Sequence, residues 1–170
     1  MSPFTRNAPV TRQFTAPQYD LKLRRTALHE AGHAVVGALF GMPITFVSVD
    51  LCDLRGVCKF GFRGSWPDQV EDATQAMAGI ASVELFAGGR DHPPGVTADE
   101  RRVEYLLESL RRAGTMESDF DPRKRADEML RTNGEVVQLV AEALLSAKGD
   151  PCILVLDGAK VESIIADHRR

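Results

Sequence analysis

Apolar side chains recur at helical spacing over residues 22–40, which predicts a buried helix in this segment. Gly41 and Pro43 follow directly and end the helical pattern. Two runs rich in β-branched and aromatic residues come next, over residues 44–51 and 57–62, with a polar turn between them. This arrangement predicts an antiparallel β-hairpin.

The remainder of the chain has a mainly helical pattern. Small residues are frequent between residues 68 and 87, so a helix there can approach a neighbouring helix closely. Glycines at 88–89 and at 114 predict helix ends, and a loop is predicted around residues 149–151. Helices are therefore predicted over about residues 68–87, 99–113, 122–148 and 158–167. The predicted fold class is mainly α (α+β), with a small β-hairpin sheet.

The length of 170 residues fits one domain with a substantial core. Hydrophobic residues make up 44% of the chain and charged residues 26%, as in soluble globular proteins. Residues 1–20 are rich in Pro, Thr, Asn and Gln and predict a flexible N-terminal arm. The folded domain is predicted to span residues 21–170.

The net charge of −3 gives no electrostatic reason to expect nucleic-acid binding. Short basic clusters alternate with acidic residues and are interpreted as solvated helix faces; they are Arg101-Arg102, Arg111-Arg112 and Arg123-Lys124-Arg125. No apolar run approaches the roughly 18 residues that cross a bilayer, and the first 20 residues lack the apolar segment of a secretory signal. We therefore expect a cytoplasmic protein that does not enter a membrane. Its three cysteines form no CxxC pair, and we expect them to be reduced and not to bind metal.

A metal-binding motif lies inside the first predicted helix, where His29-Glu30-Ala31-Gly32-His33 matches HExxH. Positions i and i+4 share one helix face, so both histidines can bind the same ion, and Glu30 beside it can act as general base on a metal-activated water. Two of the four histidines in the chain fall in this pentapeptide. Random placement would give about 0.006 such matches at this composition. A zinc site is therefore favoured over an ordinary buried helix.

A catalytic zinc site needs a third protein ligand and an open position for water. The residues by themselves leave this ligand open. The candidates are acidic or histidine side chains that follow the motif: Asp50, Glu84, Asp91, His92 and Asp99.

Five segments in order resemble the peptidase domain of the FtsH-type AAA proteases, over about residues 23–167: TALHEAGHAVVGALFG, AMAGIASVELFAGG, GVTADERR, AEALLSAKG and LDGAKVESIIA. The resemblance implies a helical FtsH peptidase-like fold. It also implies that His29, His33 and Asp99 bind zinc and that Glu30 is the catalytic residue. As an alternative to binding zinc, Asp99 could serve only as the N-cap of its helix. Glu84 matches a family glutamate that is not a ligand, which favours a role in support of the ligands or in a salt bridge.

The sequence departs from that family in three respects. Ala98 stands where the family usually has Asn, and the chain contains neither a P-loop motif nor a predicted transmembrane segment. We therefore expect an ATP-independent zinc metalloendopeptidase that cleaves unfolded polypeptides or peptides. A separate ATPase partner that supplies unfolded substrate is an alternative.

The substrate is expected to lie along a strand edge of the hairpin, as in the family, and Val57, Lys59 and Phe60 are the predicted substrate-binding residues. Two other functions remain open. One is a non-catalytic, zinc-containing module that binds peptides or acts as an adaptor, and the other is a zincin-type regulator that cuts one dedicated partner. The sequence also leaves open whether the chain is a monomer or a homo-oligomer.

Overall fold

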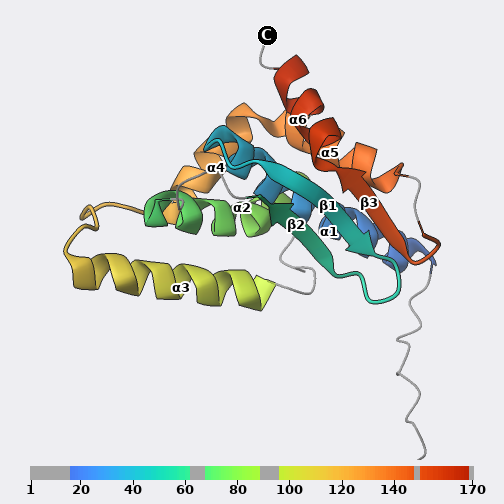
Figure 1. Ribbon diagram of the computed structural model, residues 1–170. Coiled ribbons are helices and arrows are strands. Elements are labelled where there is room, and N and C mark those ends of the chain that lie inside the picture. Colours follow the sequence, from blue (N-terminus) through green and yellow to red (C-terminus); the bar gives the residue numbers. More distant parts are fainter. Residues whose placement is uncertain (1–15, 62–67, 89–95, 148–149, 169–170) are drawn as a thin grey trace, which may run out of the picture.

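The computed structural model describes residues 16–61, 68–88, 96–147 and 150–168. Within these residues the chain is mainly helical with one small antiparallel sheet, which confirms the predicted fold class (Figure 1). In chain order the elements are α1 (Ala16–Leu39), β1 (Ile44–Asp50), β2 (Gly56–Phe60), α2 (Gln69–Phe86), α3 (Val96–Ala113), α4 (Pro122–Thr132), α5 (Gly134–Leu145), β3 (Ile153–Asp157) and α6 (Gly158–Asp167).

Helix α1 is the central element of the fold. Every residue from 25 to 37 is buried, so the helix is covered on all sides and not only along one stripe. It packs against α2, α5 and the strands β1 and β2. The HExxH motif therefore lies in the middle of the protein core.

The N-terminal end of α1 differs from the sequence prediction. The helix begins at Ala16, so residues 16–20 are helical and do not belong to a flexible arm. Residues 1–15 of the predicted arm lie outside the described part of the chain. The Tyr19 hydroxyl donates a 2.7 Å hydrogen bond to the Leu51 carbonyl, and this tertiary contact ties the first turns of α1 to the hairpin. Local composition does not reveal such a contact.

Helices α1 and α2 approach each other very closely. A Cβ atom at Gly32 would lie 2.6 Å from the Ala78 carbonyl oxygen, so only glycine fits at this crossing. The Ser82 hydroxyl donates a 2.7 Å hydrogen bond to the Leu28 carbonyl across the same interface. The close packing expected from the small residues of α2 is thus observed, and it brings α2 directly over the HExxH face.

The sheet contains three strands in the order β2-β1-β3, all antiparallel. The β1–β2 hairpin agrees with the prediction, whereas β3 was not predicted. Strand β3 consists of a short apolar run whose partner, β1, lies about a hundred residues earlier, so its pairing is not encoded locally. As a result, β2 is an edge strand with only β1 as its neighbour in the described sheet.

The predicted helix over residues 122–148 is two helices, α4 and α5, which meet at Asn133. The Asn133 side chain donates a 2.7 Å hydrogen bond to the Met129 carbonyl, which also accepts the Asn133 backbone N–H at the end of α4. Gly134 then begins α5. The apolar periodicity continues through this break, and for that reason the pattern alone predicted a single helix.

Candidate metal centre and active-site cleft

Two histidines and one aspartate converge at the surface of α1. The His29 and His33 Nε2 atoms lie 3.0 Å apart, and the Asp99 Oδ2 atom lies 2.9 Å from the first and 3.3 Å from the second. Both histidines are almost fully buried, with exposures of 2% and 6%. These three side chains form a group that could hold a metal ion.

Asp99 reaches the histidines because α3 packs along α2. The apolar stripe of α3, formed by Val103, Leu106 and Leu110, is buried, and Asp99 precedes it by one helical turn. Since α3 begins at Val96, Asp99 lies within the first turn and is not the N-cap residue. Its carboxylate therefore remains directed toward the two imidazoles.

The hydrogen bond of His33 fixes which of its nitrogens faces the site. Its Nδ1 atom lies 2.8 Å from the Gln75 carbonyl oxygen, which can only accept, so Nδ1 carries the proton. The Nε2 lone pair then points toward His29 and Asp99, as metal binding requires.

The donor set fits a zinc ion. Ligand atoms about 2.0–2.1 Å from zinc in tetrahedral geometry are roughly 3.3 Å apart, close to the separations found here. Three lone-pair-bearing atoms this close repel one another unless a cation or proton lies between them. Burial raises the pKa of the Asp99 carboxyl, but hydrogen bonds with His29 and His33 outweigh it and hold the pKa well below its ordinary value. The site therefore attracts positive charge.

Glu30 lies beside this group but does not belong to it. Its side chain is buried, and burial is the main cause that raises its pKa to about 7, against the opposing effect of nearby His33. The Cys58 backbone N–H donates a hydrogen bond to the carboxylate, and Gly56 contacts it so closely that a Cβ atom there would collide with Oε1. A carboxylate with a pKa near neutrality can accept and return a proton at physiological pH.

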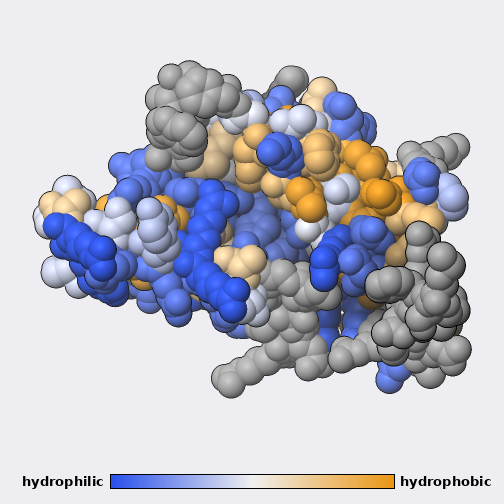
Figure 2. All heavy atoms as spheres, turned by 60° about the horizontal axis from the view of Figure 1, so that its bottom comes forward, coloured by the Kyte–Doolittle hydropathy of each residue, from blue (hydrophilic) through white to orange (hydrophobic). Residues whose placement is uncertain are grey.

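A cleft of about 230 Å³ opens at the three donors and Glu30. On the face shown in Figure 2, hydrophilic residues gather over α3 and hydrophobic residues gather toward the strands, with a hollow between them. Of the predicted substrate-binding residues, Val57 and Phe60 line the cleft, whereas Lys59 does not. The full lining is His29, Glu30, His33, Gly56, Val57, Cys58, Phe60, Gln75, Ala98, Asp99 and Arg102.

The sequence did not predict that Gln75, Gly79 and Arg102 belong to the site. Arg102 was assigned to a solvated helix face, but it lines the cleft and forms an ion pair with Asp72 of α2. Its position one turn after Asp99 on the same helix is a signal that could have found it. Gln75 and Gly79 act through backbone contacts across helices, for which the sequence carries no comparable signal.

Gly79 of α2 packs directly against the two imidazole rings. A Cβ atom there would lie 2.6 Å from His29 Cε1 and still closer to His33 Nε2. We predict that Gly79→Ala lowers the free energy of unfolding by about 1–3 kcal/mol, because the rings must shift, and that it weakens metal binding. Urea unfolding and metal analysis measure both effects. Gly61→Ala is the matched control, because a Cβ atom there would have only ordinary contacts, the nearest at 3.5 Å. Native stability and native metal binding of Gly79→Ala would contradict the prediction.

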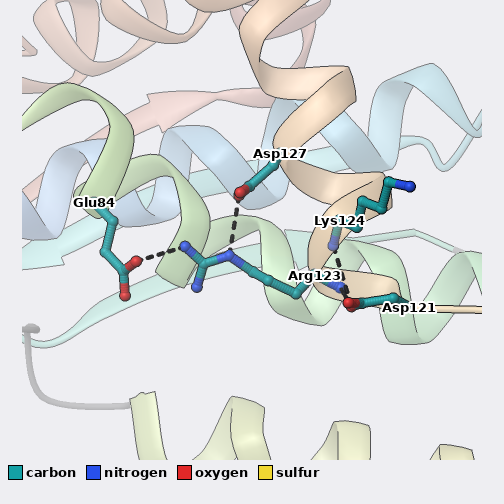
Figure 3. Close-up of polar contacts among 5 residues, drawn as sticks. All are labelled: Glu84, Asp121, Arg123, Lys124 and Asp127. Atoms are coloured by element: carbon teal, nitrogen blue, oxygen red, sulfur yellow. Dashed lines mark hydrogen bonds and ion pairs between the residues drawn. The ribbon is translucent and has the colours of Figure 1, made fainter.

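Glu84 does not approach the metal-binding group and instead forms an ion pair. Its Oε2 atom accepts a 2.6 Å hydrogen bond from Arg123 of α4, whose Nε atom donates to Asp127 at 3.0 Å (Figure 3). This contact links α2 to α4, in agreement with the expected salt-bridge role. Among the other ligand candidates, Asp50 accepts hydrogen bonds in the β1–β2 turn, and residues 91 and 92 lie outside the described part of the chain.

Comparison with known proteins gives no assignment: no protein-family model matches the chain, and no curated protein matches it significantly. Across the described residues, no helix is both long enough and apolar enough to span a membrane.

Proposed function

We propose that this protein is a zinc-dependent metalloendopeptidase of the FtsH peptidase type, which hydrolyses peptide bonds in unfolded polypeptides without ATP. One observation carries this proposal: three metal-binding side chains and a buried glutamate with a pKa near 7 meet in one cleft beside an edge strand. The resemblance of the ordered sequence segments supports the same function.

His29, His33 and Asp99 would hold the zinc ion. Zinc bound there supplies Lewis-acid chemistry, which activates water and polarises the scissile carbonyl. Glu30 accepts the proton released by the attacking water and returns it to the leaving amine. The Cys58 N–H and Gly56 hold the Glu30 carboxylate in place for both transfers.

The outer edge of β2 is the proposed binding surface for the substrate backbone. Strand β2 pairs only with β1 in the described sheet, and its Cys58 N–H already points to Glu30, so this edge faces the cleft. An extended peptide can add to such an edge through backbone hydrogen bonds, with little dependence on sequence. Val57, which is 49% exposed, and Phe60 offer apolar contacts to its side chains. Only an unfolded segment can adopt this extended form. A separate ATPase that unfolds other proteins could also supply such segments to the cleft.

A non-catalytic zinc module is the second candidate function. It accounts for the three donors equally well, but it does not require a buried carboxylate with a pKa near 7 beside them. Burial of such a group costs free energy, and a structural role offers no gain in return.

We predict that the purified protein contains about one zinc ion per chain and cleaves casein, an unfolded substrate. A chelator should stop cleavage and added zinc should restore it, because both the metal and Glu30 are required. The fluorescence released from labelled casein and mass spectrometry of the fragments measure the activity. Stoichiometric zinc without cleavage would favour the non-catalytic module, and cleavage of a single dedicated partner but not of casein would favour a regulatory peptidase.

A further inference from the structure

Two of the three cysteines, Cys52 and Cys152, meet on the protein surface away from the cleft. Cys52 lies in the turn after β1, and Cys152 directly precedes β3. Both are exposed free thiols, whereas Cys58 is partly buried and lines the cleft. A hundred residues separate the two in sequence, so the tertiary fold alone brings them together.

Two aspartates, Asp50 and Asp150, each fix the backbone at one of the two cysteines. Asp50 Oδ1 accepts a 2.7 Å hydrogen bond from the Cys52 N–H, and Asp150 Oδ1 accepts one of 2.9 Å from the Cys152 N–H. In addition, the Leu51 N–H donates a 2.7 Å hydrogen bond to the Cys152 carbonyl, which continues the β1–β3 pairing up to the cysteines.

The thiols themselves are in contact. The hydrogen bond with the Cys152 thiol is the first cause that raises the pKa of Cys52 above its ordinary value, and the Asp50 charge adds to it. Two thiols in hydrogen-bond contact beside paired strands need little movement to form a disulfide.

We propose that Cys52 and Cys152 are a redox-modification site, which forms an intramolecular disulfide with a small-molecule disulfide as oxidant. One cysteine thiolate attacks the oxidant and releases one thiol equivalent, leaving a mixed disulfide. The second thiolate attacks the protein sulfur of that mixed disulfide and releases the other thiol equivalent. Two protons and two electrons leave the cysteine pair, and the oxidant is reduced to two thiols. This proposal is independent of the proposed peptidase function.

The cross-link would close a loop of about 100 residues and connect the hairpin turn to β3. Such a loop restricts the unfolded chain strongly, so the oxidised protein should melt about 5–10 °C above the reduced protein.

The test is to incubate the full chain with excess oxidised glutathione, alkylate the remaining thiols after denaturation and analyse the peptides by mass spectrometry. The expected result is a Cys52–Cys152 link within one chain, alkylation of Cys58 alone and the higher melting temperature. Cys52→Ser and Cys152→Ser should each carry glutathione at the remaining exposed cysteine, without the melting shift. Cys58→Ser is the matched control and should form the link as the native chain does.

Two outcomes would overturn the proposal. One is stable glutathione on both Cys52 and Cys152 of the native chain, and the other is disulfides between chains in place of the internal link. Either result would mean that the two thiols react as independent surface groups.

Discussion

Replacement of Glu30 by glutamine is expected to lower kcat/KM for casein cleavage by about 10²–10⁴-fold while zinc remains bound. Glutamine has nearly the same shape and can occupy the same buried position, but its amide cannot accept the proton from water. His29, His33 and Asp99 retain their positions, so the metal content should stay at about one ion per chain. Initial cleavage rates and metal analysis on the same preparation measure the two effects separately.

Glu84→Gln is the matched control, because it makes the same chemical change on the neighbouring helix. It should leave cleavage and zinc content unchanged and cost at most about 1 kcal/mol of stability, since its ion pair with Arg123 is partly exposed to solvent. Full activity of Glu30→Gln would show that Glu30 is not the proton acceptor. Loss of zinc in Glu84→Gln would show that the ligand set is wrong.

Replacement of Asp99 by asparagine is expected to weaken zinc binding by more than about 100-fold, beyond the effect typical of residues that only orient the ligands. The change removes the negative charge that stabilises the cation and leaves two neutral imidazoles as protein ligands. Cleavage should fall together with zinc occupancy and recover in part at high zinc concentration. Competition with a chromophoric zinc chelator measures the affinity.

Glu100→Gln is the control for this variant. Glu100 is the next residue of α3 and is exposed, so its loss changes the net charge equally without touching the site. Zinc affinity in Glu100→Gln should equal that of the native chain. If Asp99→Asn also kept native affinity, the third ligand would have to be sought elsewhere, with His92 as the next candidate.

The sequence predicted part of this site through local spacing. His29 and His33 are four residues apart on one helix, so their proximity follows from helical geometry alone. Asp99 lies on a different helix, far from the motif in sequence, and it was selected through the family resemblance, because no spacing rule connects separate helices. The structure brings Asp99 to the histidines, whereas its role as a zinc ligand stays a prediction.

Most of the features that were not predicted depend on tertiary contacts. Gly79 lies against the imidazoles because α1 and α2 cross closely, and its place in an alanine-rich helix indicates only close packing. Strand β3 is set by its pairing with the distant strand β1. The break at Asn133 is instead local, because the Asn133 side chain bonds to the Met129 carbonyl four residues earlier. Periodicity describes which face of an element is apolar, but it does not identify the partner of that face.

We propose that His29, His33 and Asp99 bind one zinc ion at the base of the cleft. Anomalous X-ray diffraction at the zinc absorption edge, from crystals of the purified protein, tests it most directly. Zinc binding by this group predicts a single strong peak about 2.0–2.2 Å from His29 Nε2, His33 Nε2 and an Asp99 carboxylate oxygen. A zinc-loaded crystal with no peak between these three side chains, or with the ion bound by other residues, would contradict it.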